Sequence, residues 1–237
     1  MNPHEVKAAI QETLRGNTHI TVTAPTGGGK SYFVGLLLEQ AYAARKPWIV
    51  LDTSDRNHIG LIQLKGVTPL KIRKTENPDY SQLLTRPFIL CYPDDEMEID
   101  DLIEEYRKII QALLRAQKPR IICVEECHYY QKSAHQADKN LERISRIGRK
   151  YGITGWFITQ RCQDLPKILW SSSRYYMIMH YYLHTDKSYL SNQINRFEEI
   201  NNQLQPYDVL VYNSERDEHT RLEATAIKEA RVTKHYG

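Results

Sequence analysis

The sequence predicts an α/β fold in which a mostly parallel central sheet is flanked by helices. Short apolar runs typical of buried strands alternate with helical patterns along nearly the whole chain. The segment "APTGGGKS" joins the first such strand to the first long helical pattern. At 237 residues, the chain is long enough for one well-buried α/β domain and short for two. We therefore expect a single domain over residues 1–237.

The expected elements follow from the spacing of apolar residues. Strands are expected where short runs of apolar, β-branched and aromatic residues lie between turn residues, at 18–24, 48–52, 68–74, 86–92, 120–126, 153–160, 174–182, 207–213 and 221–228. Helices are expected where apolar residues recur every three or four positions, at 1–16, 30–45, 98–117, 137–150, 164–170 and 186–200. Within the single domain, this places the core at about 18–213 and a C-terminal strand and tail at 214–237.

The helix at 98–117 has the clearest pattern, because its apolar residues form one stripe from Ile99 to Leu114. Acidic residues gather at its start, over 94–101, and Arg115 and Lys118 lie at its end. Both groups complement the helix dipole. The dipole therefore explains the acidic cluster without a metal site.

Composition excludes several classes of protein. Hydrophobic residues make up 41% and charged residues 26%, which is ordinary for a globular domain, and the net charge of +3 permits contact with nucleic acid without arguing for it. The sequence contains no run of about 18 apolar residues, so no membrane span is predicted. The charged N-terminus argues against a signal peptide. The four cysteines form no CxxC pair, so we expect each of them to be a small buried hydrophobic residue rather than part of a disulfide.

Residues 24–31, "APTGGGKS", match a phosphate-binding loop in which alanine replaces the first glycine. Glycines let the backbone take positive φ and turn its N–H groups toward phosphate oxygens, and the following helix N-terminus adds positive potential. Lys30 should reach the β- and γ-phosphates of ATP, and the Ser31 hydroxyl should bind Mg²⁺. The residues predicted to bind the nucleotide are Pro25, Thr26, Gly27, Gly28, Gly29, Lys30, Ser31 and Tyr32.

Two adjacent carboxylates, Glu125 and Glu126, follow the core strand that contains "IICV". Ligands of parallel α/β sheets bind at the carboxyl ends of the strands, so both side chains should lie beside the phosphate loop. Hydrolysis of ATP needs an acid that orders Mg²⁺ and usually a carboxylate that orients or deprotonates water. We predict that Glu125 holds the metal through water, together with Ser31, and that Glu126 acts on the attacking water.

Two further polar residues are expected at the same edge of the sheet, since Asp52 and Gln160 each end a predicted strand. A glutamine there can hydrogen-bond the γ-phosphate or its water and report hydrolysis to a neighbouring element. Both residues are candidate catalytic groups, and the alternative for each is a simple polar residue at a strand end.

Taken in order, these motifs resemble the HerA/FtsK superfamily of DNA-pumping ATPases. The likeness rests on "APTGGGKS", "WIVLD", "IICVEECH" and "RISRIGRKYGITGWFITQRCQDLP", and spans about 18–185 with no motif match over 53–97. It implies a RecA-like (ASCE) P-loop core and a ring, commonly a hexamer, with nucleotide held between subunits. It also implies an arginine supplied in trans, for which Arg149 matches the family's Gly-Arg-Lys position. Arg143 and Arg146 are alternatives on nearly the same helix face.

The resemblance also implies a function. HerA proper carries an N-terminal β-barrel, and FtsK carries membrane spans and a DNA-reading domain, neither of which is expected here. The remaining motor core is similar to the genome-packaging ATPases of tailless icosahedral viruses. This implies an Mg²⁺-dependent, DNA-stimulated ATPase that moves double-stranded DNA of any sequence into a preformed capsid. The implied location is the cytoplasm; for a viral protein this is the cytoplasm of the host, with association at the virion vertex. The implied docking partner is a capsid-vertex protein or a membrane protein.

Several alternatives stay open. A DNA-transfer or filamentous-phage-assembly and secretion ATPase of the same superfamily would share these motifs. A P-loop kinase is disfavoured, because the paired carboxylates with Gln160 favour water as the phosphoryl acceptor. A nucleotide-switched binding protein would show weak turnover and no response to DNA. For a motor, Lys132 and Lys139 are candidate DNA-contacting residues in the channel.

Overall fold

The computed structural model describes residues 1–54, 57–74, 80–131 and 136–236. The strands over these residues are β1 (His19–Thr23), β2 (Trp48–Leu51), β3 (Val67–Ile72), β4 (Phe88–Pro93), β5 (Arg120–Val124), β6 (Ile153–Thr159), β7 (Ser173–Met179), β8 (Val209–Asn213) and β9 (Glu218–Leu222). The α-helices are α1 (Pro3–Thr13), α2 (Lys30–Ala43), α3 (Ser81–Thr85), α4 (Ile99–Ala116), α5 (Lys139–Ile147), α6 (Lys167–Ser172), α7 (His184–Ser191), α8 (Phe197–Gln203) and α9 (Ala224–Ala230). Short 3₁₀ turns are η1 (Ile59–Gln63), η2 (Cys127–Tyr130), η3 (Gly148–Tyr151) and η4 (Cys162–Asp164).

The strands form one sheet in the order β3-β4-β2-β5-β6-β1-β7-β8-β9. Every pair from β3 through β7 is parallel, and β8 and β9 are added antiparallel at one edge. This confirms the predicted α/β class with a mostly parallel sheet. The central strands β5 and β6 are buried along their whole length, as expected of strands covered by helices on both faces.

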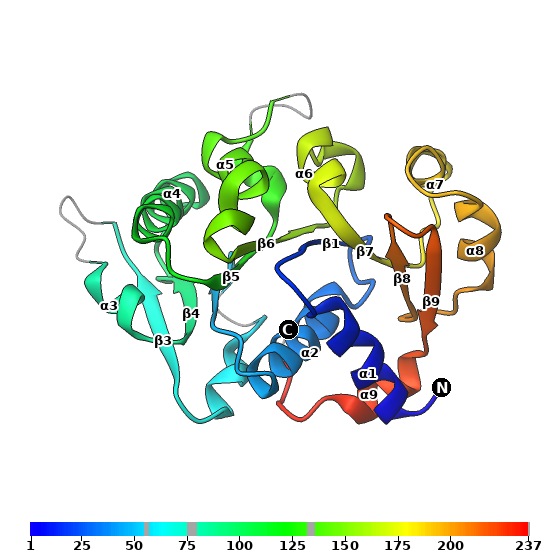
Figure 1. Cartoon of the computed structure of the whole chain (residues 1–237), viewed down its shortest axis with the longest axis horizontal. Helices are drawn as coiled ribbons and strands as arrows, with labels where there is room; N and C mark the ends of the chain where they lie inside the picture. Colours follow the sequence, from blue (N-terminus) through cyan, green and yellow to red (C-terminus); the bar gives the residue numbers. More distant parts are fainter. Residues whose placement is uncertain (55–56, 75–79, 132–135, 237) are drawn as a thin grey trace.

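Helices cover the sheet on both faces, with α4, α5 and α6 on one side and α1, α2 and α9 on the other (Figure 1). Each layer has its own apolar core against the sheet. Helix α4 buries the predicted apolar stripe from Leu102 to Leu114 and leaves Ile99 exposed. Asp94 of the acidic cluster pairs with Lys71 and Arg73, from the end of β3 and just beyond it. All four cysteines are buried and free, as predicted. Over the described residues, no helix has both the length and the apolar character of a bilayer span.

Two expected elements were wrong. The single helix expected at 186–200 is divided into α7 and α8, and Arg196 just before α8 has a left-handed backbone with φ of 57°. The strand expected at 221–228 ends at Leu222, and α9 follows. There, Ala226, Ile227 and Ala230 recur at helical spacing and are buried against the layer of α1 and α2. The short apolar run was compatible with either structure, and packing onto those two helices decided it.

The four central strands β2, β5, β6 and β1 lie side by side, and the candidate site residues follow their carboxyl ends. The parallel registers place Leu51 beside Val124 and Val22 beside Ile158, so these strands end at one common edge. Segments from 24, 52, 125 and 160 onward therefore meet there, although up to 136 positions separate them in the chain.

Candidate nucleotide-binding site

The phosphate loop turns sharply between β1 and α2. Gly27 and Gly29 have φ of 75° and 86°, a left-handed conformation that favours glycine. The Gly28 N–H donates to the Pro25 carbonyl at 2.9 Å, and a Cβ at Gly28 would lie 2.9 Å from that oxygen. No side chain caps the N-terminus of α2 at Gly29. The loop is therefore a cradle made of backbone, with helix N–H groups left for an anion.

A pocket of about 620 Å³ opens beside this loop. One wall is the loop and the start of α2, residues 25–33, with Glu126 and Gln160. The opposite wall comes from the C-terminal part of the chain: Tyr207, Ala224, Thr225, Ile227, Lys228 and His235. The volume is in the range of sites for nucleotide-sized ligands.

Lys30 is the charged centre of the site. Its side chain is buried, and its Nζ lies 2.8 Å from Glu126 Oε1 and 3.2 Å from Glu125 Oε2. Burial by itself would lower the pKa of Lys30, but the charges of Glu125 and Glu126 outweigh burial and raise it. The lysine is therefore a permanent cation at neutral pH, held between two carboxylates.

Glu125 is completely buried and is held at both oxygens. Its Oε1 lies 2.7 Å from His58 Nε2, while Oε2 faces Lys30. Burial opposes the charged form of Glu125, but Lys30 and His58 lower its pKa to about 2. Asp52 is buried nearby, and burial raises its pKa to about 7 against the opposing charge of His58. Neither Glu125 nor Asp52 lines the pocket itself.

Glu126 lines the pocket, and its side chain is 15% exposed whereas that of Glu125 is 0% exposed. Its backbone is left-handed, with φ of 45°. Its Oε2 lies 3.2 Å from His128 Nδ1 and accepts the Gln160 backbone N–H at 3.3 Å. The Thr26 hydroxyl donates to Gln160 Oε1 at 2.8 Å, which ties the phosphate loop to the end of β6.

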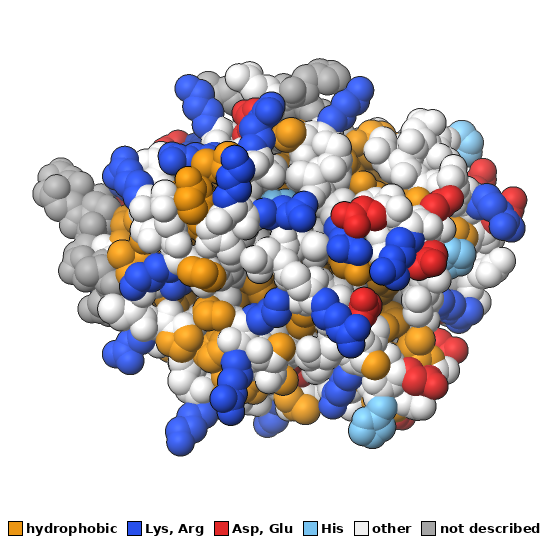
Figure 2. Space-filling view, viewed as in Figure 1, with side chains coloured by type: hydrophobic (Ala, Val, Ile, Leu, Met, Phe, Trp, Pro, Cys, Tyr) orange, Lys and Arg blue, Asp and Glu red, His pale blue; other side chains and the backbone are white. Residues whose placement is uncertain are grey.

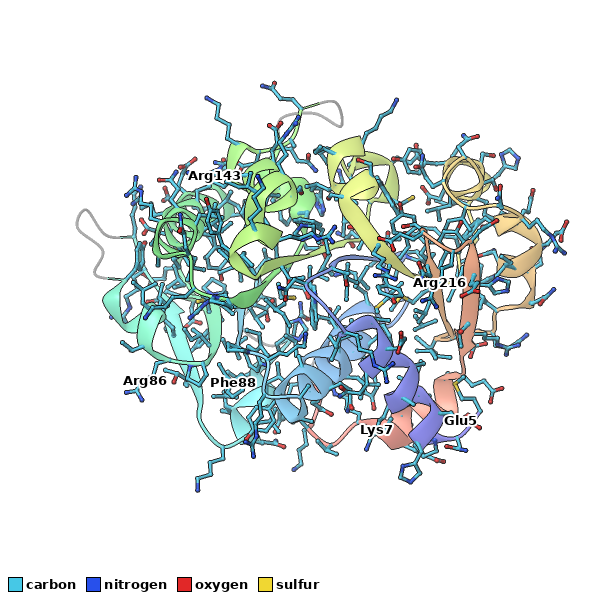
Figure 3. All side chains as sticks on the ribbon, viewed as in Figure 1. Glu5, Lys7, Arg86, Phe88, Arg143 and Arg216 are labelled. Atoms are coloured by element: carbon cyan, nitrogen blue, oxygen red, sulfur yellow. The ribbon has the colours of Figure 1, made fainter. Side chains whose placement is uncertain are left out.

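The candidate arginines do not join this group. Arg149 lies in η3, immediately before β6, and is therefore at the amino ends of the strands, opposite the phosphate loop. Arg143 and Arg146 are exposed on α5, where Arg143 is labelled in Figure 3, and Arg146 pairs with Glu142 at 2.7 Å. Among the described residues that line the pocket, none is an arginine. Lys139 is exposed at the start of α5, and Lys132 lies outside the described residues.

Sequence reasoning missed several residues of the site. His58 belongs to the stretch 53–97, which matches no motif, and nothing in the local sequence marks it as a partner of Glu125. Tyr207, His235 and the α9 residues come from the segment that was expected to be the end of the core and a C-terminal tail. The antiparallel β8 starts at the carboxyl end of β7 and so brings Tyr207 to the pocket, whereas the return of the chain to α2 brings α9 and His235 there.

The residues present fit a nucleoside triphosphate with Mg²⁺. The backbone cradle and the Lys30 cation suit phosphate, and the Ser31 side chain at the first turn of α2 is positioned with them along the pocket. Within the described ranges, no cluster of three or more His, Cys, Asp or Glu could hold a metal ion alone. A magnesium ion here would thus take most of its ligands from phosphate oxygens and water, which is its usual preference.

Comparisons with known proteins agree with this fold. The family model for the central domain of helicase HerA matches residues 6–55. The genome packaging NTPase B204 from Sulfolobus turreted icosahedral virus 2, solved with ATP-gammaS, has a TM-score of 0.69 at 14% identity, covering 87% of this chain and 97% of that chain. No curated protein sequence matches this chain.

Two other solved structures have the same fold. VirB4 of Thermoanaerobacter pseudethanolicus has a TM-score of 0.66 at 10% identity, covering 86% of this chain and 88% of that one. The bacterial conjugative coupling protein TrwB, lacking its first 70 residues, has a TM-score of 0.64 at 11% identity, covering 94% of this chain and 92% of that one. These findings confirm the resemblance to HerA/FtsK-type ATPases and the RecA-like P-loop fold.

Proposed function

We propose that this chain is an Mg²⁺-dependent ATPase that moves double-stranded DNA, and that it packages a viral genome into a preformed capsid. The observation that carries the proposal is the contact of Lys30 with two adjacent carboxylates, next to a pocket of nucleotide size. A phosphate loop alone supports binding. The second carboxylate, facing the pocket and linked to Gln160, supports hydrolysis.

Each group has a role in this proposal. The backbone of residues 25–32 would cradle the phosphates, and Ser31 and Glu125 would hold Mg²⁺, Glu125 through water and with the oxygen that Lys30 leaves when it turns to phosphate. The ion, when bound with ATP, neutralises charge on the phosphate oxygens. Without nucleotide, Lys30 Nζ donates to Glu126 Oε1. When Lys30 turns to phosphate, the contacts of Glu126 that remain are those with His128 and the Gln160 N–H. Glu126 is then free to orient water and accept its proton, with Gln160 beside it and Asp52 buried behind.

The DNA part of the proposal is supported by the likeness in fold to the genome packaging NTPase and to the conjugative coupling protein. Lys and Arg side chains are spread over the face drawn in Figure 2. Exposed basic residues precede several strands at the edge away from the site, such as Arg45, Arg86 and Lys118. Such a surface suits contact with DNA phosphates regardless of sequence.

The assembly is a further part of the proposal. The position of Arg149 at the edge opposite the phosphate loop supports a ring, proposed as a hexamer, in which this arginine reaches the nucleotide of a neighbouring subunit. Both helical layers share one sheet, which supports a single domain over residues 1–237. We place the motor in the cytoplasm, that of the host for a viral protein, docked to a capsid-vertex or membrane protein.

The test is steady-state ATP hydrolysis with and without long double-stranded DNA and Mg²⁺. We expect a several-fold rise with duplex, no turnover without Mg²⁺, and loss of turnover with retained nucleotide binding in Glu126→Gln. Hydrolysis that ignores duplex would contradict DNA as the cargo of the isolated chain. No hydrolysis at all would favour a nucleotide-switched binding protein.

A second candidate is a DNA-transfer or secretion ATPase of the same superfamily, which the likeness in fold to the conjugative coupling protein supports. Both candidates predict the same nucleotide chemistry. They differ in the docking partner. Duplex DNA that becomes resistant to nuclease when it is incubated with empty capsids, ATP and this protein would favour packaging. Absence of protection, with DNA-stimulated turnover intact, would favour DNA transfer.

A further inference from the structure

The last described residues, 231–236, form a segment that we call the C-terminal strap, and it lies against α2 beside the site (Figure 1). The buried Glu39 carboxylate of α2 accepts the backbone N–H of Val232 at 2.9 Å and that of Thr233 at 2.8 Å. It also accepts the Thr233 hydroxyl at 2.5 Å. Arg231 donates to the Tyr32 carbonyl at 2.6 Å, and its guanidinium lies 4.4 Å from the centre of the Tyr32 ring. Residues at the end of the chain are thereby fixed to the helix that carries Lys30.

Two glycines make room for the strap. A Cβ at Gly35 of α2 would lie 2.4 Å from the Arg231 guanidinium, and a Cβ at Gly60 of η1 would lie 1.8 Å from the Lys234 carbonyl oxygen. Neither glycine has positive φ, so the lack of a side chain is what matters at both. The Gln63 side chain accepts the Lys234 backbone N–H and donates to the Tyr236 hydroxyl, each at 3.4 Å. The strap therefore holds η1 as well as α2.

The turn η1 begins immediately after His58. The His58 carbonyl accepts the Leu61 N–H at 2.9 Å and so opens the turn, and the His58 side chain is completely buried against Glu125. A charged carboxylate only accepts hydrogen bonds, which means that His58 Nε2 carries the hydrogen of this 2.7 Å contact. His58 therefore holds the one Glu125 oxygen that Lys30 does not hold.

We propose that His58 is a positioning residue for Glu125 and that the C-terminal strap keeps His58 in place by holding η1. The proposal rests on the ATPase function proposed above. The His58 imidazole fixes the orientation of the Glu125 carboxylate, and the strap fixes the backbone from which His58 projects. Partners of this kind, one contact away from the metal, change activity strongly without touching substrate. The strap then acts on the site only indirectly, through His58 and Glu125, although it lies about 110 residues beyond Glu125 in sequence.

The first test does not depend on activity. In nucleotide-free protein with ¹⁵N-labelled histidine, the Nε2–H of His58 should give a slowly exchanging, downfield proton signal, assigned by its loss in His58→Ala. Glu125→Gln should shift it. Thr233→Val and Gly60→Ala, which disturb the strap, should broaden or abolish it. Val232→Ala is the matched control, because that residue is 69% exposed within the same strap. A signal unchanged in both strap variants would show that the strap does not position His58.

The second test is the split between kcat and KM. His58→Ala should lower kcat by about 10- to 100-fold with KM for ATP within about twofold, and His58→Gln, which keeps a donor, should recover part of kcat. Thr233→Val should give an intermediate kcat at unchanged KM, and Val232→Ala should match wild type. A His58→Ala variant with wild-type kcat would refute the positioning role. Failure of the wild-type protein to hydrolyse ATP would refute the proposed function instead, while the histidine signal would still decide whether His58, Glu125 and the strap are linked.

Discussion

The Thr26 hydroxyl donates a hydrogen bond of 2.8 Å to Oε1 of Gln160, across 134 positions of the chain. The same glutamine donates its backbone N–H to Glu126. One residue thus joins the phosphate loop to the carboxylate proposed to act on water. Any movement of the loop on binding phosphate changes the contact at Gln160, and through it the surroundings of Glu126.

We predict that Gln160→Ala lowers kcat by about 100-fold while nucleotide affinity stays within about threefold, because a polar group beside the reacting water is lost and the loop is kept. Thr26→Val should cause a smaller fall, since the Gln160 side chain is kept and only its hydrogen bond to the loop is lost. Steady-state hydrolysis and titration with a fluorescent ATP analogue measure the two quantities. Wild-type kcat in Gln160→Ala would mean that this glutamine is only a polar strand end.

Lys30→Met should destabilise the protein as well as abolish turnover. Removal of the lysine leaves the buried Glu125 without its cation, next to the like charge of the partly exposed Glu126, and breaking such a buried pair costs about 3 kcal/mol of unfolding free energy. The double variant Lys30→Met/Glu126→Gln should regain part of that loss. Lys46→Met is the control, because Lys46 contacts a backbone carbonyl and stability should change by less than about 0.5 kcal/mol. Urea unfolding measures all three, and equal stability of Lys30→Met and wild type would contradict the network.

Stability should fall as pH falls below neutrality, through His19. Burial, aided by the charge of Arg149, lowers the pKa of this fully buried histidine from 6.5 to about 4. Between those values the unfolded chain binds the proton and the folded chain does not. The stabilisation is therefore complete above pH 6.5 and is lost as pH falls toward 4, by about 3 kcal/mol. In denaturant melts from pH 7 to 4, His19→Gln should lose less stability than wild type, whereas His4→Gln, exposed on α1, should follow wild type.

Arg149→Ala should abolish hydrolysis without weakening nucleotide binding, because Arg149 is absent from the pocket of its own subunit. Mixing Arg149→Ala with Glu126→Gln protein should restore part of the activity, since a mixed interface combines an intact site with an intact arginine. Neither variant alone should be active. A mixture as inactive as its components would argue that the arginine acts within its own subunit, and the same mixing with Arg143→Ala or Arg146→Ala would decide between the alternatives.

Local patterns were sufficient for most of the sheet. Parallel strands buried on both faces are continuous apolar runs, so "WIVL", "RIICV" and "ITGWFIT" identify themselves as β2, β5 and β6. The phosphate loop was equally clear, because its glycines, lysine and serine are consecutive. The residues after those strands were correctly expected at one edge, since parallel strands share a direction.

Where patterns failed, the decision lay in contacts between distant segments. The run 224–230 is apolar enough for a strand, and it is a helix because α1 and α2 offer it a surface to cover. The split between α7 and α8 likewise has no glycine or proline to announce it, since a left-handed Arg196 makes the turn.

By itself, the sequence determined the α/β class, the phosphate loop and the paired carboxylates, because each depends on neighbours along the chain. Only the tertiary structure decided that Lys30 is held by both Glu125 and Glu126, that His58 completes the surroundings of Glu125, and that the C-terminal strap returns to α2 and η1. The physical reason is that these contacts are set by strand order and by space left at Gly35 and Gly60, and neither is written in any local spacing of residues.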